Sequence, residues 1–577
     1  MFALFKKYMK SALIFAILAP LSMGVEVFMD IRQPTLMSEI IDVGIPAGDV
    51  SLIVSLGKWM ALYALIGLFG GIGCSTCSTL AATRFGSSVR QALFNKITTL
   101  SYKEIDEFTT SSLITRMTND VAQVQQVVMM GLRALARAPF QCIFGLIASY
   151  RLSPRLALIF VAAIPILAIA VAVIIVKAFP LFSQVQKRVD RVNTVMRENL
   201  LGVKVVKAFV GQTREKQRFE TTNSDLMSWS MRSAFLTITL TPISTFVLNA
   251  SVIALFWFGG NMAIGGSIET GKIMALTTYL TQVLASIMQV MMILMVLSRA
   301  MASAERINAV LTTEPEIRDD LNPELPQSAS VEFDRVNFRY NDSDPEYVLK
   351  DVSFAVNSGE TVGIIGATGS GKSTLVALIP RLYDVGEGSV RIGGADVRKI
   401  PRKRLTRDVG VVLQESILFA GSIRENLRWA DEECEFEVLE EAAQDAQAAE
   451  FIAAKPYGYD SPVEQRGKNF SGGQKQRLSI ARTFARRPKI LILDDSTSAV
   501  DTATEAKIRE AIKRRGGGTT VFIIAQRISA IMRADRIIVL DEGRVSGIGS
   551  HAELLRSNEI YRAIAVSQLG EEVLEDG

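Results

Sequence analysis

Long apolar segments recur through roughly the first 300 residues of this 577-residue chain, and they limit what it can fold into. Each is long enough to cross the hydrocarbon core of a bilayer as a helix, which takes about 20 mainly apolar residues. A helix is expected because a backbone in lipid finds no water to satisfy its hydrogen bonds. The six expected spans are residues 11–33, 54–83, 125–150, 155–180, 236–262 and 273–299.

The sequence after about residue 315 has a different character, that of a soluble α/β domain. A chain of this length exceeds what one hydrophobic core supports, so more than one domain is expected. The predicted boundary is an acidic, proline-containing linker at 312–330. We therefore predict a membrane α-helical six-span domain at 1–311, with two long cytoplasmic loops, fused to an α/β domain at 331–577.

Basic residues indicate which connections between the spans face the cytoplasm. Five of them lie in residues 84–116, after the second span, and nine lie in residues 187–218, after the fourth. The positive-inside rule places these connections, the N-terminus and the soluble half in the cytoplasm. The short connection 150–155 also contains two arginines, but it is outweighed. No cleavage site follows the first apolar run, so we expect an uncleaved first helix and a multi-pass protein of the cell membrane.

The two basic connections continue the helical period, so spans two to five are expected to extend well beyond the membrane. Such extensions allow membrane helices to reach a domain in the cytoplasm. Their tips, at 102–112 and 208–215, are the predicted contacts with the soluble domain.

Polar residues inside the spans leave alternatives open. Arg133 and Arg137 interrupt the third span one helical turn apart, and they either line an aqueous cavity or pack near the cytoplasmic end. Glu26 and Asp30, near the predicted outer end of the first span, form either a solvated helix end or a gate closed by ion pairs. A methionine face in the sixth span fits either ordinary packing or contact with varied apolar ligands. Its members are Met288, Met291, Met292 and Met295.

Composition says less about partners. The net charge of +4 gives no reason to expect a nucleic acid. The four cysteines are too few and too scattered for a disulfide framework. Cys74 and Cys77 form a C-x-x-C inside an apolar run, where packing is favoured over a metal or redox pair.

A phosphate-binding loop follows a predicted buried strand at 361–365. Its sequence, G-A-T-G-S-G-K-S, occupies residues 366–373, and a helix is expected to follow. A strand, this spacing of glycines and lysine, and then a helix are the combination that binds nucleotide phosphates. The glycines let backbone N–H groups close around the phosphates at the helix N-terminus. Lys372 is expected to reach the β- and γ-phosphates of ATP, and Ser373 to bind Mg²⁺.

Two later motifs also indicate a nucleotide site. An apolar strand at 490–494 ends in Asp494, the form of a metal-orienting aspartate in phosphate-loop enzymes. Before it, residues 469–477 read N-F-S-G-G-Q-K-Q-R, a glycine-containing turn that opens a helix. That turn alone is a weak signal, but its place between the other two motifs makes it specific.

Together these motifs resemble those of an ABC exporter half-transporter of the type IV fold, in which six spans and one ABC nucleotide-binding domain share a chain. The likeness covers essentially the whole chain. It implies that ATP and Mg²⁺ bind, and that two nucleotide-binding domains enclose two ATP molecules. Each site then combines the phosphate loop of one chain with the signature of the other. Residues 469–474 correspond to that signature, with Phe470 in place of the usual leucine.

The resemblance also implies individual site residues. Tyr340 corresponds to the aromatic residue that stacks on adenine, and Gln414 to the Q-loop glutamine that senses Mg²⁺ and the membrane helices. Residues 498–501 correspond to the D-loop. The implied metal ligands are Ser373, Gln414 and Asp494. The implied nucleotide-binding residues are Tyr340, Gly366, Thr368, Gly369, Ser370, Gly371, Lys372, Ser373, Thr374, Gln414, Ser471, Gly472, Gly473, Gln474 and Asp501.

Three positions depart from the family's pattern. Asp495 stands where the family has the glutamate that positions the attacking water, and its side chain is one methylene shorter. Gln526 replaces the switch histidine at the γ-phosphate, and an amide cannot carry a positive charge. Gln465 takes the place of a glutamate before the signature, beside Glu464. A positioned acid or base contributes about 10²–10⁴-fold in rate, so the site is expected to bind ATP and hydrolyse it poorly.

This pair of losses at Asp495 and Gln526 resembles the degenerate subunit of heterodimeric multidrug ABC exporters. It implies a second ABC half-transporter that retains the glutamate and the histidine. The family also implies ATP-driven export of small amphipathic, drug-like or lipid-like compounds across a lipid membrane. Two alternatives stay open: a homodimeric exporter with slow ATPase, and an ATP-gated membrane regulator that binds without cycling.

Overall fold

The computed structural model describes residues 2–341, 344–496, 498–515 and 518–570, apart from the side chains of 2, 3, 291, 292, 294, 295, 298 and 299. These residues belong to two compact units. The first consists of Met1–Thr98 and Thr110–Thr313, and the second of Thr99–Thr109 and Glu314–Gly577. The predicted boundaries at 311 and 330 stay predictions. Each unit is described separately below.

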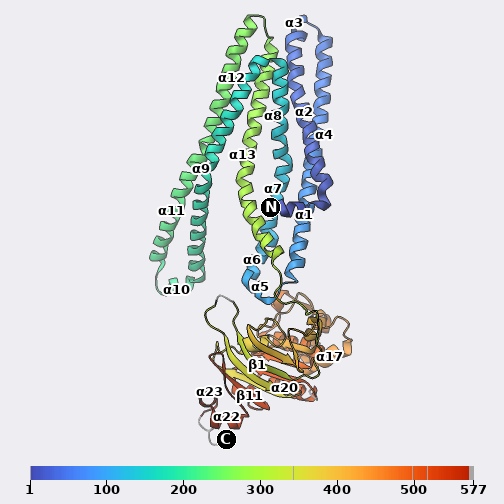
Figure 1. Ribbon diagram of the computed structural model, residues 1–577, viewed down its shortest axis with the longest axis vertical. Helices are drawn as coiled ribbons and strands as arrows, with labels where there is room; N and C mark the ends of the chain where they lie inside the picture. The colour runs from blue at the N-terminus through green and yellow to red at the C-terminus, as the bar shows by residue number, and fades with distance from the viewer. Residues whose placement is uncertain (1, 342–343, 497, 516–517, 571–577) are drawn as a thin grey trace. The chain divides into compact units, whose positions relative to one another are not determined.

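The first unit is a helical bundle (Figure 1). The described residues contain six helical stretches long and apolar enough to cross a membrane, which confirms the six predicted spans. The helices are α1 (Phe2–Tyr8), α2 (Leu13–Glu39), α3 (Ile45–Ala47), α4 (Val50–Ile97), α6 (Thr110–Thr115), α7 (Val121–Met130), α8 (Ala136–Leu152), α9 (Pro154–Leu201), α10 (Val203–Ala208), α11 (Gln212–Ile238), α12 (Leu240–Ile264) and α13 (Thr270–Thr312).

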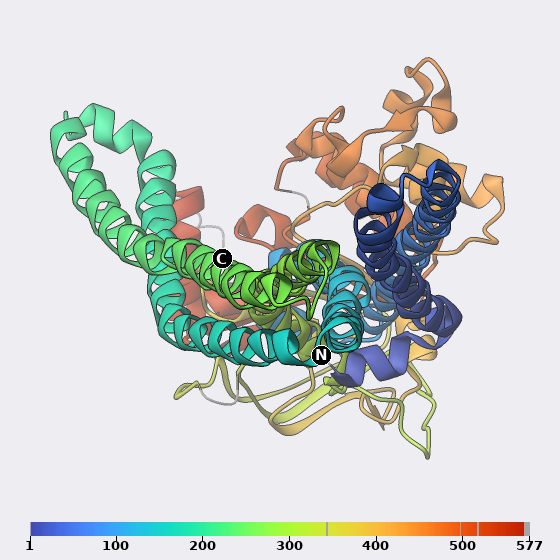
Figure 2. The same cartoon turned by 90° about the horizontal axis from the view of Figure 1, so that it is seen from above.

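Several of these helices are much longer than a bilayer requires. α4 and α9 each contain 48 residues, or roughly 70 Å at 1.5 Å per residue, against a hydrocarbon core of about 30 Å. α9 and α11 run side by side and are joined through α10 (Figure 1). Seen from above, the α9–α12 group and the α2–α4 pair lie on opposite sides of the bundle, with α13 between them (Figure 2). The predicted extension of the spans is therefore present.

Regular burial along α2 explains how the bundle is held together. Ala19, Met23, Val27 and Ile31 recur every fourth residue and are nearly inaccessible to solvent, so they form one face of the helix. They belong to an apolar cluster with residues of α9, α12 and α13. At the same interface the Tyr279 hydroxyl donates to the backbone oxygen of Ile31 at 2.8 Å. A buried phenol needs such a partner in an apolar interior.

The prediction that Glu26 and Asp30 lie near the outer end of the first span is wrong. α2 continues to Glu39 and is followed by a helical turn, so both carboxylates lie inside the helix. The guanidinium of Arg137 on α8 donates to Glu26 Oε1 and to Asp30 Oδ2, at 3.1 Å each. The predicted span ends at residue 33, whereas the helix continues to Glu39 with both carboxylates paired to Arg137 inside it.

The second unit contains two main sheets. The strands are β1 (Val331–Phe338), β2 (Leu349–Val356), β3 (Thr361–Gly366), β4 (Glu387–Ile392), β5 (Ala395–Asp396), β6 (Val409–Val412), β7 (Gly421–Ser422), β8 (Pro462–Val463), β9 (Ile490–Asp494), β10 (Thr520–Ile524), β11 (Arg536–Asp541) and β12 (Arg544–Gly549). An antiparallel sheet has the order β2-β1-β4-β5, and a larger sheet has the order β12-β11-β3-β10-β9-β6.

The larger sheet is parallel apart from the β11–β12 pair. Every residue of β9 and β10 is buried, the pattern of parallel strands covered on both faces. The helices of the second unit are α5 (Tyr102–Phe108), α14 (Lys372–Ala377), α15 (Arg402–Asp408), α16 (Ile423–Arg428), α17 (Phe436–Asp445), α18 (Ala449–Ala453), α19 (Gly472–Ala485), α20 (Thr502–Arg515), α21 (Ile528–Ile531), α22 (His551–Ser557) and α23 (Glu559–Leu569). The predicted strands at 361–365 and 490–494 are confirmed as β3 and β9.

Candidate nucleotide-binding site

The order of the parallel strands brings the predicted motifs to one edge of the sheet. β3, β10 and β9 are neighbours with the same direction, so their carboxyl ends lie together. The phosphate loop follows β3, Asp494 ends β9, and Gln526 comes two residues after β10. Gln414 follows β6, the parallel neighbour of β9, and its side chain is exposed at this edge. The motifs are far apart in sequence, and the sheet joins them.

The phosphate loop needs glycine at two positions. A Cβ at Gly366 would lie 2.1 Å from the carbonyl oxygen of Leu540 on β11, so any side chain would push the strands apart. Gly371 has a φ of 95°, a conformation that other residues rarely adopt. Between them, Thr368 and Gly369 are exposed and Ser370 is buried. The backbone is therefore free to curl around an anion ahead of α14.

Lys372 lies across this loop. Its ammonium donates to the backbone oxygens of Gly366 at 2.9 Å and Ala367 at 2.7 Å, and to Ser370 Oγ at 3.4 Å. Burial lowers the pKa of Lys372, and the carboxylates of Asp494 and Asp495 oppose that effect. An ammonium held by neutral carbonyls in a partly buried loop can exchange them for phosphate oxygens, which are better charged partners.

Ser373 and Asp494 form the part of the site that can hold a metal ion. The Ser373 hydroxyl donates to Asp494 Oδ1 at 3.0 Å, and burial raises the pKa of Asp494. Within the described residues, no cluster of three or more His, Cys, Asp or Glu side chains suitable for a metal is found. Mg²⁺ needs no such cluster, because it binds through one or two protein oxygens while keeping water and phosphate ligands. These two oxygens therefore fit Mg²⁺ bound with a nucleotide.

The two substituted positions are hydrogen-bonded to each other. Gln526 Nε2 donates to Asp495 Oδ2 at 3.1 Å. Asp495 has a φ of 46°, and its backbone N–H donates to the oxygen of Ile524 at 3.0 Å, which fixes it beside the end of β10. Burial raises the pKa of Asp495, while Arg527 and Lys372 oppose the rise. The Asp495 carboxylate is thus already engaged by the neutral amide.

Tyr340 and Thr374 are in contact beside the end of the loop. Tyr340 follows β1 and is 41% exposed, so a planar ligand can reach its ring. Its hydroxyl and the Thr374 hydroxyl are 2.8 Å apart and share a hydrogen bond. Thr374 is buried on α14. The structure therefore connects the predicted aromatic residue directly to the helix that follows the phosphate loop.

The signature residues form the start of α19. Ser471 caps the helix by accepting from the backbone N–H of Gln474 at 3.3 Å, and Gln474 Oε1 accepts from the backbone N–H of Ser471 at 3.1 Å. Gly472 and Gly473 occupy the first turn, where a Cβ at Gly473 would meet the Ala499 oxygen at 2.7 Å. Across the described part of the chain, the signature makes no hydrogen bond to the chain's own phosphate loop.

The contacts of two residues, Gln476 and Tyr383, could not be predicted from the sequence. A third residue, Asp501, caps a helix. Gln476 accepts from the backbone N–H of Ala499 at 3.0 Å, which ties α19 to the predicted D-loop. Tyr383 contacts both Tyr340 and α5, and no pattern in the sequence indicates this. Asp501 accepts from the backbone N–H of Thr504 at 2.9 Å, as expected of a residue that caps α20.

A membrane bundle fused to a domain whose phosphate loop and metal-binding oxygens share one sheet edge, with a signature that opens a separate helix, defines an ATP-driven membrane transporter. Residues 16–287 match the family of the ABC transporter transmembrane region, and residues 349–498 match the ABC transporter family. The uncharacterized ABC transporter ATP-binding protein YfiB of Bacillus subtilis is 39% identical, over 98% of both chains. The chain belongs to the ABC transporter family, as an exporter-type half-transporter with a cytoplasmic ATPase domain.

Other similar proteins have more specific names. An ATP-dependent lipid A-core flippase of Syntrophus aciditrophicus is 31% identical over 89% of this chain and 87% of that protein. A fatty acid ABC transporter ATP-binding/permease protein of Mycobacterium bovis is 34% identical over 82% of this chain and 75% of that protein. The solved structure of a bacterial Atm1-family ABC exporter with ATP bound matches with a TM-score of 0.78 over 99% of both chains. At 24% identity, this last likeness shows the fold alone.

Proposed function

We propose that this chain is one subunit of a heterodimeric ABC exporter, that its own ATP site binds ATP but hydrolyses it poorly, and that its signature completes the active site of the partner. The observation that carries the proposal is the hydrogen bond from Gln526 Nε2 to Asp495 Oδ2, at 3.1 Å. It holds the two substituted side chains against each other. A carboxylate in that bond is poorly placed to take a proton from water.

The remaining residues of the site support binding. Lys372 supplies a positive charge to the phosphates, and Ser373 and Asp494 supply oxygens to Mg²⁺. Bound Mg²⁺ would neutralise charge on the phosphate oxygens. Tyr340 offers an exposed ring to the adenine. Gln526 cannot supply the positive charge of an imidazolium, and a missing positioned acid or base costs about 10²–10⁴-fold in rate.

Exposed apolar residues at the tip between α9 and α11 support a partner subunit. Leu201 and Phe209 are each 82% exposed, and Val210 is 77% exposed. Large apolar side chains gathered at one surface usually mark a protein contact. Because the signature is not bonded to its own phosphate loop, a second nucleotide-binding domain is also the natural partner for Ser471. We propose that this second domain keeps the glutamate and the histidine.

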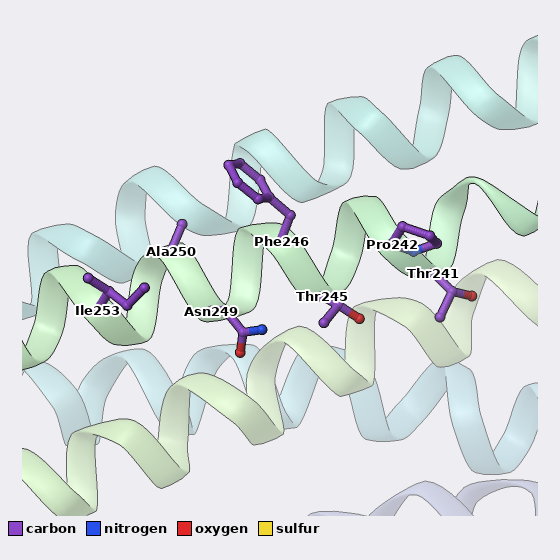
Figure 3. A pocket seen from close by; sticks show the side chains of 7 residues that line it. All are labelled: Thr241, Pro242, Thr245, Phe246, Asn249, Ala250 and Ile253. Carbon is purple, nitrogen blue, oxygen red and sulfur yellow. The ribbon is translucent and has the colours of Figure 1, made fainter.

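A groove along α12 supports an amphipathic cargo. It encloses about 530 Å³, and its lining side chains come from one face of the helix (Figure 3). Thr241, Thr245 and Asn249 recur every fourth residue there, beside Phe246 and Ile253, which are 74% and 67% exposed. Polar side chains in a membrane helix normally face a cavity or another helix rather than lipid. The names of two relatives, a lipid A-core flippase and a fatty acid transporter, agree with a lipid-like cargo.

The test is the steady-state ATPase of the purified full chain, with ATP binding measured on the same sample. We expect binding with near-zero turnover. Brisk turnover by the chain alone would favour a homodimer and contradict the proposal. Absence of turnover even with the co-purified partner would favour a non-cycling regulator.

A double substitution, Asp495→Glu with Gln526→His, sharpens this test. It lengthens the carboxylate and restores an imidazole, so we expect turnover at this site to rise by about 10²-fold or more. The measurement uses a complex in which the partner's own glutamate is replaced by glutamine, so that only this site contributes. Lys372→Ala in the same background is the control, and it should abolish the gain.

A further inference from the structure

A single phenol connects α5 to the aromatic side of the nucleotide site. Tyr383, which lies between α14 and β4, donates its hydroxyl to Asp106 Oδ2 at 2.5 Å. Asp106 belongs to α5, which lies in the same compact unit as the nucleotide-binding residues. A hydrogen bond from a neutral hydroxyl to a carboxylate is stronger than one between neutral groups. α5 follows α4 in the chain, so this bond ends a segment that begins in the membrane bundle.

The ring of Tyr383 contacts the predicted adenine-binding residue. Its centroid lies 5.2 Å from that of Tyr340, with the two planes at 87°. Phe338 completes the cluster, 5.1 Å from Tyr340 and 5.8 Å from Tyr383. Edge-to-face pairs at these distances are favourable and depend on ring orientation. The orientation of Tyr340 is therefore coupled to the position of Tyr383.

Other contacts of α5 lead to the linker. Glu104 accepts from the backbone N–H of Glu316 at 3.0 Å, and Lys103 forms an ion pair with Glu316 at 3.1 Å. Both contacts hold α5 to the linker that precedes β1. The ring centroid of Tyr102 instead lies 6.0 Å from that of Tyr383, and Asp106 accepts from the Tyr383 hydroxyl. Tyr383 therefore joins α5 to the tyrosine that is predicted to bind adenine.

The hydroxyl of Tyr383 stays a donor over the whole working range of pH. Burial first, and then the bond to Asp106, raise the pKa of Tyr383 above its ordinary value. A movement of α5 must therefore either carry the ring with it or break the bond.

We propose that Tyr383 is a positioning residue through which α5 sets the orientation of Tyr340 and hence the affinity for the adenine base. The inference rests on the proposed role of Tyr340 in binding adenine. Because Lys372 and Ser373 bind the phosphates separately, the affinity for a bare triphosphate does not depend on Tyr383. Movement of α5 then changes the fit of the base and leaves the phosphate contacts in place.

Binding of MgATP and of magnesium tripolyphosphate, which lacks the base, separates these contributions. Both are measured by calorimetry on the full chain in lipid nanodiscs, for the wild type, Tyr383→Phe and Asp106→Asn. We expect each variant to bind ATP about three- to tenfold more weakly, the effect of losing up to about 1.4 kcal/mol, and to bind tripolyphosphate unchanged. The double variant should be no weaker than either single one, because both remove the same bond.

Tyr347→Phe is the matched control. Tyr347 also donates its hydroxyl to a carboxylate of this domain, Glu387, at 3.3 Å. Loss of this hydrogen bond should change the affinity for neither MgATP nor magnesium tripolyphosphate. Hydrogen exchange of residues 102–108 gives a second readout: ATP should protect α5 in the wild type and not in Tyr383→Phe.

Tyr340→Ala distinguishes failure of this inference from failure of the proposed function. One outcome is that Tyr340→Ala weakens the binding of ATP but not of tripolyphosphate, while Tyr383→Phe changes neither. Tyr383 is then no positioning residue, and the proposed adenine contact stands. If Tyr383→Phe lowers the affinity for both ligands equally, Tyr383 only supports the structure of the domain, which overturns the inference. If Tyr340→Ala has no selective effect, the adenine contact itself is wrong.

Discussion

His551, the one histidine of the chain, lies outside the nucleotide site and packs between the last two helices. Its Nδ1 is 2.6 Å from the Tyr561 hydroxyl, and burial lowers its pKa from 6.5. Below pH 6.5 the unfolded chain therefore takes up a proton that the folded chain resists, so stability falls as the pH drops. We expect faster hydrogen exchange in α22 and α23 at about pH 5.5 than at about pH 7.5, after correction for intrinsic rates.

His551→Gln provides the control for this pH dependence. A neutral amide cannot titrate, so exchange from α22 and α23 should lose its dependence on pH over the same range. Histidine is the side chain whose ordinary pKa lies there, and the chain has only one. An unchanged dependence in the variant would assign the effect to other groups.

The ion pairs of Arg137 join two helices of the membrane bundle, α2 and α8. The side chains of Arg137, Glu26 and Asp30 are 34%, 18% and 31% exposed, so the charges are partly shielded from solvent. Arg137→Met leaves two carboxylates without their cation, which costs more than the pairs contribute as a whole. We expect a loss of about 1–3 kcal/mol, less than for fully buried pairs because of the remaining exposure. Thermal unfolding in nanodiscs measures it.

Arg133→Met is the matched variant for this experiment, since Arg133 lies one turn away and is exposed. It should cost much less than Arg137→Met. Neutralising all three partners, with Glu26→Gln, Asp30→Asn and Arg137→Met, should restore most of the stability. Equal losses from the two arginine variants would show that the ion pairs contribute nothing specific.

Of the methionine face, Met291, Met292 and Met295 lie outside the described side chains, while Met288 accepts from Ser244 at 3.0 Å.

For the whole molecule, the proposed arrangement separates the phosphate loop and the signature of one chain into two different sites. Ser471→Ala should then lower the ATPase of the complex to about a tenth or less, because it removes a hydrogen bond at the partner's reacting site. ATP binding at the loop around Lys372 should be unchanged. The measurement is ATPase and nucleotide affinity on the co-purified complex. Loss of ATP binding at the chain's own loop would mean that the signature acts within its own chain.

Much of this architecture could be predicted from the sequence, because its signals are local. The six spans follow from the length of the apolar runs, and the phosphate loop follows from glycine spacing in residues 366–373. The substitutions at Asp495 and Gln526 are also visible in the sequence, because each follows a buried strand by one or two residues. Periodicity and loop chemistry depend on near neighbours in the chain, so no knowledge of packing is needed to read them.

The tertiary structure alone decided which distant groups meet. Arg137 lies 111 residues from Glu26 and 107 from Asp30, and no sequence pattern specifies that pairing. Tyr383 and Asp106 are 277 residues apart, and only the packing of α5 joins them. Even the bond between Asp495 and Gln526 depends on β9 and β10 being parallel neighbours. Contacts of this kind are set by how whole elements pack, whereas the sequence by itself determines the elements and the chemistry at their ends.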